Sequence, residues 1–248
     1  MAIQRVSSKW AKTNVLIKSE ELRDQIPVTV EWSQDALNQM LNKYGMVYVK
    51  PDFGTYGSGV IRVQKSSSGN YSFQVKTKKR AFPSFEQMIV PLQRIISNRP
   101  YLIQRGIYLL KYSRRRFDLR VMVQKNDTNE WESTGIIGRL SHPRKIVTNY
   151  HSGGTPMSIE KLMGRHLSHA DIAAYKTQLC KQGVAIATQL QTKYPRLKEI
   201  GVDVAVDTSL KPWILEVNTL PDPYIFRKLQ DKRIFRKIRR YCKLYGRL

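Results

Sequence analysis

The chain has 248 residues, enough for one large domain or two small lobes around a sizeable buried core. A hydrophobic content of 41% and an aromatic content of 10% exclude wholesale disorder. The charge is unusual, because 43 Lys and Arg against 19 Asp and Glu give a formal net charge of +24. Such a field attracts polyanions, including nucleic acid, nucleotides, anionic membrane surfaces and acidic peptides.

The cysteines and histidines argue against disulfide-rich and zinc-binding classes. Cys180 and Cys242 provide neither a disulfide framework nor a metal-ligand spacing, which fits a reducing, cytoplasmic setting. None of the four histidines belongs to an HExxH-like pair. No apolar run approaches the roughly 20 residues that a membrane span requires, and the N-terminus lacks the apolar region of a signal peptide. We therefore expect a soluble protein without a transmembrane segment.

The first half of the chain alternates helical and extended patterns. Residues 8–25 are predicted to be helical and end before Pro27, and a helix over 33–45 has Ser33 as its N-cap and Gly45 as its stop. The strand MVYVKP is followed by a glycine-rich loop and a returning strand, over 46–51, 52–59 and 60–66. Next come a predicted strand, a helix with an internal proline and a buried strand, over 71–77, 84–97 and 100–107.

The second half begins with a predicted hairpin and ends with a basic segment. The runs FDLRVMVQKN and WESTGIIGRL pair around a turn near residues 126–129, and the longest amphipathic helix covers 169–195. A second hairpin joins 201–207 to 212–218, and a single basic helix is predicted over 223–248. This order indicates an α+β fold rather than a regular βαβ array. The basic helix is expected either to recruit an anionic partner or simply to face solvent.

A lysine at the end of a strand precedes the glycine-rich loop in KPDFGTYGSGV. Lys50 can offer a positive charge to phosphates, and the loop can surround phosphate oxygens with backbone N–H groups and hydroxyls from Gly54, Thr55, Gly57, Ser58 and Gly59. The segment is not a P-loop, because the lysine precedes the glycines. Taken alone it is equally well interpreted as a glycine-rich hairpin turn.

The segment ILEVN combines two polar oxygen ligands with apolar neighbours. Glu216 and Asn218 are two residues apart on a predicted strand and leave the same face. We expect Ile214 to share that face and Leu215 to point to the opposite one. Oxygen-only ligands suit Mg²⁺, and the preceding strand brings Asp203 beside Glu216. The alternative is an edge strand whose polar side faces solvent.

Two further segments carry polar side chains with two possible interpretations. FDLRVMV places Asp118 and Arg120 on one strand face, either as nucleotide and phosphate contacts or as members of a cross-strand ion pair. TNYHSGG offers Asn149, His151 and two glycines in a loop where a ligand can approach the backbone, although alone it is typical of any turn.

Taken in order, these segments resemble those of the ATP-grasp ligases, including D-alanine–D-alanine ligase and the ribosomal-protein glutamate ligases. They are most similar to the YheC/YheD-like, endospore coat-associated group, which shares the SKW opening, YVKP, FDLRV-VQKN, GI-GR and HSGG features. The resemblance covers residues 8–221. It implies a two-lobed α+β ATP-grasp fold with nucleotide between the lobes, and without a separate N-terminal domain.

Within residues 1–248 the resemblance implies one ATP-grasp unit with four segments. These are an N-terminal helical segment, a phosphate-lid lobe, a metal-binding lobe and a basic C-terminal helix, over 1–45, 46–105, 106–222 and 223–248.

The resemblance also implies roles for individual residues. Lys50 matches the lysine on the α- and β-phosphates, and Gly54 to Gly59 match the lid. The hinge whose backbone meets adenine matches Gln104, Arg105, Gly106 and Ile107. The remaining nucleotide contacts match Asp118, Arg120 and Asn149, and the ligands of two Mg²⁺ ions match Asp203, Glu216 and Asn218. Lys9 or Lys12 matches a second family lysine, and Arg139, Arg144 or Lys145 are candidates to replace family arginines near HSGG.

The implied reaction is ATP- and Mg²⁺-dependent ligation of a carboxylate to an amine through an acylphosphate, with Lys50 and Arg120 neutralising the developing charge. An acidic peptide or protein is the expected acceptor. The alternative is a non-catalytic scaffold that binds nucleic acid or an anionic spore or cell component through its basic surface. The expected location is the cytoplasm, with association to the spore as a further expectation.

Overall fold

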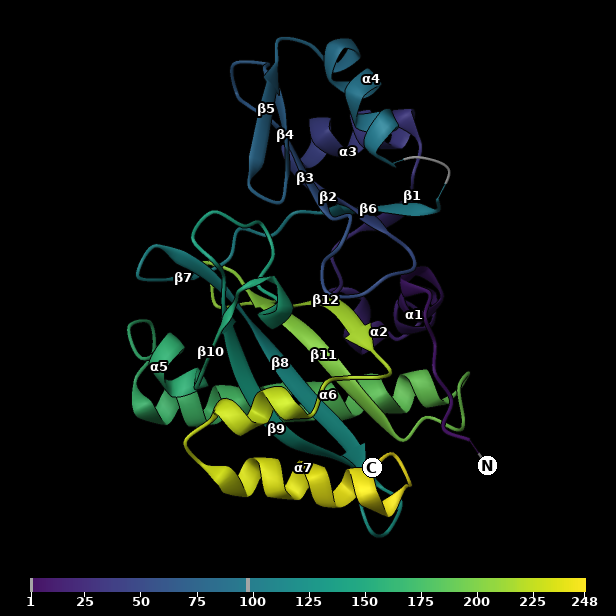
Figure 1. Cartoon of the computed structure of the whole chain (residues 1–248), viewed down its shortest axis with the longest axis vertical. Coiled ribbons are helices and arrows are strands. Elements are labelled where there is room, and N and C mark those ends of the chain that lie inside the picture. The colour runs from purple at the N-terminus through teal and green to yellow at the C-terminus, as the bar shows by residue number, and fades with distance from the viewer. Residues whose placement is uncertain (1, 97–98) are drawn as a thin grey trace.

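A computed structural model describes residues 2–96 and 99–248 and has two lobes joined by a short hinge (Figure 1). Each lobe is built on an antiparallel sheet covered by helices, so the predicted α+β class is confirmed. Within the described residues, no helix is both long and apolar enough to cross a membrane.

The first lobe, at the top of Figure 1, has a mainly consecutive sheet with helices on one face. Its strand order is β1 (Thr29–Glu31), β6 (Tyr101–Arg105), β2 (Met46–Pro51), β3 (Ile61–Lys65), β4 (Tyr71–Val75) and β5 (Lys78–Phe82). The helices are α3 (Gln34–Tyr44) and α4 (Phe85–Ile96). The predicted caps of α3 are confirmed, since Ser33 accepts the Ala36 N–H and Gly45 has a left-handed φ of 68°.

The second lobe contains the larger sheet. Its strands run in the order β10 (Thr155–Met157), β9 (Trp131–Leu140), β8 (Arg115–Lys125), β11 (Glu199–Val206) and β12 (Pro212–Asn218), with β7 (Lys111–Tyr112) paired to β8. The helical elements are η1 (Tyr150–Ser152), α5 (Ile159–Met163), α6 (His169–Gln191), η2 (Tyr224–Lys228) and α7 (Lys232–Leu244). Both predicted hairpins of this lobe are present.

The N-terminal segment is divided between the lobes. Helices α1 (Lys9–Leu16) and α2 (Glu20–Arg23) pack their apolar residues into the core of the second lobe, where Val15, Leu16 and Leu22 are buried. Strand β1 and helix α3 instead join the first lobe. The chain therefore crosses between the lobes near residue 28 and again at the hinge after β6.

The C-terminal segment differs from the prediction of one helix over 223–248, which was wrong. Helix α7 begins only at Lys232, where Asp231 caps it by accepting the Arg233 N–H. It is preceded by the short η2, and Leu229 between them has an extended ψ of 149°. The break lets η2 and α7 pack separately, since Phe226 and Ile238 both reach the same apolar cluster beneath the sheet.

Successive side chains on each strand point to opposite faces of the large sheet, so the two faces carry different residues. On β8, Leu119 and Val121 pack into the core that includes α6, so Asp118 and Arg120 face the opposite side. Met122 lies farther along that side and packs with Phe226 of η2. One end of this face is therefore covered by η2 and α7, and the other end faces the first lobe.

Candidate active site

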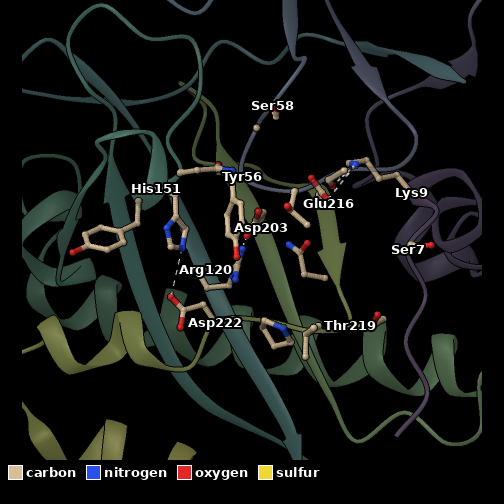
Figure 2. A pocket seen from close by; sticks show the side chains of 18 of the residues that line it. Ser7, Lys9, Tyr56, Ser58, Arg120, His151, Asp203, Glu216, Thr219 and Asp222 are labelled. Atoms are coloured by element: carbon tan, nitrogen blue, oxygen red, sulfur yellow. Dashed lines mark hydrogen bonds and ion pairs between the residues drawn. The ribbon is translucent and has the colours of Figure 1, made fainter. Parts of the chain in front are cut away.

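A cavity of about 880 Å³ lies between the lobes. Figure 2 shows side chains from the lid, α1, β8, η1, β11, β12 and the loop after β12 converging on it. Among the described residues, seven cationic side chains line the cavity against three carboxylates: Arg5, Lys9, Lys12, Lys50, Arg120, Arg139 and Arg247 against Asp203, Glu216 and Asp222. The excess positive charge suits a polyanionic ligand.

A smaller cavity of about 110 Å³ opens beside it at the hinge. Its walls are mostly apolar and include Tyr48, Ile107 and Leu215. The Gly106 N–H donates to the Met46 carbonyl at 2.9 Å, whereas the Ile107 N–H makes no hydrogen bond within the described part of the chain. An apolar slot with a free backbone donor suits a flat heteroaromatic ring.

The hinge needs glycine at its closest approach to β2. A Cβ added to Gly106 would lie 2.5 Å from the side chain of Met46 and 2.9 Å from its carbonyl. The predicted hinge residues Gln104, Arg105 and Ile107 all border the small cavity. Their contact with adenine stays a prediction.

Lys50 lies where the small and large cavities meet. It is 8% exposed, and its Nζ donates to Oε1 of Gln104 at 3.0 Å and to the carbonyl of Leu215 at 3.1 Å. Burial lowers the pKa of Lys50 to about 8, opposed in part by the charge of Glu216. A buried cation held by two neutral acceptors gains from an anionic ligand, as the predicted phosphate contact requires.

Lys9 and Lys12 both line the large cavity from α1. Lys9 donates to the carbonyl of Gly54 at 3.0 Å, and its Nζ lies 3.8 Å from Oε1 of Glu216. Lys12 instead donates to the carbonyl of Val6 at 2.7 Å, and burial lowers its pKa to about 8. Lys9 is thus the N-terminal lysine that contacts the base of the lid.

The predicted metal ligands are brought together on β11 and β12. Asp203 pairs in register with Glu216, as expected from the hairpin, and Asn218 also lines the cavity. The described residues contain no group of three or more His, Cys, Asp or Glu side chains fit for a metal ion; the set here is two carboxylates and a carboxamide.

Those ligands still have oxygen atoms to offer. Both arginine contacts of Asp203 are to Oδ1, and no hydrogen bond within the described residues engages its Oδ2 or the side chain of Asn218. The nearest cation to Glu216 is Lys9, at 3.8 Å. A few oxygen donors completed by phosphates and water form the environment that Mg²⁺ prefers, so this donor set fits the ion.

The expected directions of Ile214 and Leu215 were both wrong, because β12 contains a β-bulge. Asp203 pairs with Glu216 and the next residue, Val204, pairs with Ile214, which leaves Leu215 without a partner. Ile214 is 3% exposed in the core that includes α6. Leu215 instead packs with Ile107 and lines the small cavity, while Glu216 faces the large one.

A buried ion-pair network lies under the cavity. Arg139 donates to both carboxylate oxygens of Asp118, at 2.9 and 2.6 Å, and lies 3.0 Å from Oδ1 of Asp203. Arg120 donates to the same Oδ1 at 2.5 Å. Although burial opposes both shifts, these contacts raise the pKa of Arg139 and lower that of Asp203.

The network assigns cross-strand partners to both members of the DLR segment. Asp118 accepts from Arg139 through both carboxylate oxygens and from Thr148 at 2.5 Å. These contacts make the orientation of Arg139 the role that the structure gives to Asp118. Its predicted nucleotide contact stays a prediction. Arg120 and Arg139 line the large cavity, and Asn149 lines both cavities. Of the three candidate replacement cations near HSGG, Arg139 is the one on the cavity wall.

The lid lies against the TNYHSGG loop. The ring of Tyr56 lies 4.2 Å from that of His151, and Ser152 donates to the Tyr56 carbonyl at 3.1 Å. A Cβ at Gly57, whose φ is +71°, would lie 3.2 Å from Val147. The two loops therefore meet over the cavity, as Figure 2 shows for Tyr56 and His151.

The outer end of the cavity, which is lined by Arg5 and Arg247, was not predicted from the sequence. Glu199, which is fully buried, lies 2.8 Å from Arg5 and 2.5 Å from Arg247. The same arginines donate to the carbonyls of Thr219 and Pro221, and both line the cavity. The ends of the described chain thus hold the loop that follows Asn218. These residues are too distant in sequence for any local pattern to connect them.

The comparisons with known proteins agree with this architecture. N5-carboxyaminoimidazole synthetase of Staphylococcus aureus, solved with ADP, has a TM-score of 0.58 at 10% identity, over 99% of this chain and 53% of that one. The ATP-grasp ligase PsnB, solved with a minimal precursor, Mg and ADP, has a TM-score of 0.53 at 13% identity, over 97% and 59%. The fold is therefore that of the ATP-grasp proteins.

The sequence comparisons identify a particular family among the ATP-grasp proteins. The model of the YheC/D-like ATP-grasp family matches residues 2–248, so the chain belongs to this family. The endospore coat-associated protein YheD of Bacillus subtilis (strain 168) is 24% identical over 229 residues, which are 88% of this chain and 49% of YheD. The chain thus spans about half the length of this relative.

Proposed function

We propose that the protein is an ATP- and Mg²⁺-dependent ligase that joins a carboxylate to an amine through an acylphosphate, with an acidic peptide or protein as its acceptor. The observation that carries the proposal is the opposition of Lys50 to Asp203 and Glu216 in one cavity, next to an apolar slot. This arrangement separates a ring-binding end from a charge-binding end. The ATP-grasp ligase PsnB, solved with a minimal precursor together with Mg and ADP, supports by analogy an acceptor that binds beside the nucleotide.

The proposed reaction has two balanced steps. An oxygen of the substrate carboxylate attacks the γ-phosphorus of ATP, forming the acylphosphate and releasing ADP. The amine then attacks the acyl carbon, forming the amide and releasing phosphate and a proton. Lys50 and Arg120 are the residues proposed to hold and neutralise the phosphate oxygens as charge develops.

Asp203, Glu216 and Asn218 are proposed to hold two Mg²⁺ ions. Bound Mg²⁺ supplies charge neutralisation and orientation of phosphate oxygens. Lys9 links Glu216 to the base of the lid through its contact with Gly54. We propose that this contact couples lid closure to metal binding.

The outer end of the cavity supports an anionic acceptor. Arg5 and Arg247 share the single carboxylate of Glu199, which leaves one positive charge in excess. Arginine binds carboxylates through several N–H groups at once. An acidic side chain or chain terminus is therefore the proposed occupant of this end.

We place the activity in the cytoplasm with association to the spore, since the relative YheD is endospore coat-associated. The second candidate is a scaffold that binds an anionic component without turnover, and the net charge of +24 favours it.

The test is ADP release from Mg-ATP in the presence of a panel of acidic peptides, with hydroxylamine added to trap the acylphosphate as a hydroxamate. We expect peptide-dependent ADP release and hydroxamate formation. ATP binding without either product across the panel would contradict the ligase and favour the scaffold. Absence of ATP binding would contradict both the ligase and the nucleotide site.

A further inference from the structure

Helix α7 has seven basic residues and no acidic ones, and they are not equivalent. Its buried side, which includes Ile238 and Cys242, packs on the sheet with η2. A second side is neutralised: Lys237 pairs with Glu132, and Arg240 with Asp127 at 2.8 Å. Arg233 is likewise paired with Asp231, at 2.9 Å.

The other four basic residues form no ion pair within the described residues. All four are exposed, and we call them the basic stripe: Lys232, Arg236, Arg239 and Lys243. Their spacing of four, three and four residues places them within about 40° of one direction and along about 16 Å of the helix. Carboxylates therefore neutralise one flank of α7, while this straight row keeps its charge.

The composition of the stripe restricts its partner. The apolar side of α7 is buried against the sheet, so it is not free to enter a membrane or to anchor a protein partner. The stripe has no aromatic side chain on which a single-stranded base could stack. Lysine and arginine are the usual contacts to backbone phosphates, and the stripe lacks the Asn, Gln, Asp and Glu side chains that read other base edges. Duplex DNA, with one charge per about 1.7 Å of axis, complements a straight row of cations.

We propose that the basic stripe of α7 binds the phosphate backbone of double-stranded DNA without sequence specificity. Helix α7 lies at the lower edge of the second lobe in Figure 1, and its residues 232–244 do not line the interlobe cavity. The binding is therefore independent of the proposed ligase reaction. Four phosphate contacts give a slope of log affinity against log salt of about −3.6.

The test reverses three stripe charges, Arg236→Glu, Arg239→Glu and Lys243→Glu, in the full chain. Lys232 is left intact because its Nζ donates to the carbonyls of Arg227 and Leu229. Binding to a 20-base-pair DNA duplex is followed by fluorescence anisotropy between 50 and 200 mM salt. We expect at least a tenfold loss of affinity and a salt slope smaller by about 2.7, the value for three contacts.

A matched control carries the same change of net charge on the other lobe. Lys76, Lys78 and Lys79 are exposed at the β5 end of the first sheet, and their reversal to Glu should leave most of the DNA affinity. ADP binding by calorimetry should be unchanged in both variants, which confirms that each is folded. Equal losses in the two variants, no DNA binding by the parent, or tighter binding of an RNA duplex of the same sequence would each overturn the proposal.

Discussion

Lys50 offers the sharpest test of the nucleotide site. Burial of its charge should lower the free energy of unfolding of the ligand-free protein, and the phosphates of a bound nucleotide should offset that loss. Its pKa falls from 10.5 to about 8 through burial. A difference of this size corresponds to about 3 kcal/mol of unfavourable charge burial at neutral pH. Lys50→Met removes that cost together with two hydrogen bonds, each worth about 1 kcal/mol. We therefore expect the ligand-free variant to be as stable as the parent or slightly more so.

The sign of the pH dependence follows from the lowered pKa. Between pH 8 and 10.5 the unfolded chain binds more protons at this position than the folded chain. The Lys50 contribution to the free energy of unfolding therefore rises with pH across that window and is constant below it. Urea unfolding at pH 7 and pH 10 should show the difference between variant and parent shifting against the variant as pH rises.

Bound nucleotide should make the charged form of Lys50 favourable instead of costly. The phosphates favour the charged lysine, so ATP binding at pH 8 should take up about half a proton at Lys50. Lys12, whose pKa is also lowered to about 8 by burial, should take up a similar amount. We expect Lys50→Met to halve the uptake and to weaken Mg-ATP binding by about 1–3 kcal/mol, or roughly 5- to 150-fold.

Calorimetry of Mg-ATP binding in two buffers of different ionisation enthalpy measures this uptake directly. Lys18→Met, at an exposed position outside the cavity, is the control and should match the parent in both affinity and proton uptake. If Lys50→Met bound Mg-ATP with parental affinity and parental uptake at pH 8, the placement of phosphate at Lys50 would be refuted.

Two further predictions concern the metal ligands and the lid. Glu216→Gln combined with Asn218→Ala should leave the fold intact, as read by circular dichroism, while abolishing Mg²⁺-dependent turnover of ATP, because both oxygen ligands on β12 are altered; turnover at the parental rate would contradict the metal assignment. Phe53, which precedes the lid, and Tyr56 within it are 52% and 58% exposed, so chymotrypsin should cut there, and a saturating ATP analogue should slow the cleavage at least several-fold. Cleavage at an unchanged rate in saturated protein would argue against a lid that orders over phosphates.

Much of the fold could be predicted because its signals are local. Helix α3 has a capping serine and a terminating glycine within its own sequence. The hairpin that brings Asp203 near Glu216 was predicted from two short strands around a turn, although their direct pairing depends on the bulge at Leu215. The break before α7 was missed because its basic and apolar residues continue at helical spacing through Leu229. Packing of η2 and α7 on one cluster decides that geometry, and packing is a long-range property.

The outer end of the cavity could not be predicted for a related reason. A buried glutamate on a strand looks unfavourable from sequence, and only the fold brings two arginines to it. Arg5 and Arg247 approach Glu199 from opposite ends of the chain. Neither arginine has a local neighbour that marks it as different from the other cations.

The bulge at Leu215 explains why one face of β12 serves both cavities. Regular alternation would place Leu215 and Glu216 on opposite sides of the sheet. The extra residue instead directs Leu215 into the hinge slot and Glu216 toward the charged cavity. It also presents the Leu215 carbonyl to Lys50, at 3.1 Å, and to Gln104, at 3.4 Å, both from the first lobe. The irregular residue thus joins the two lobes at the point where the proposed nucleotide passes from its ring to its phosphates.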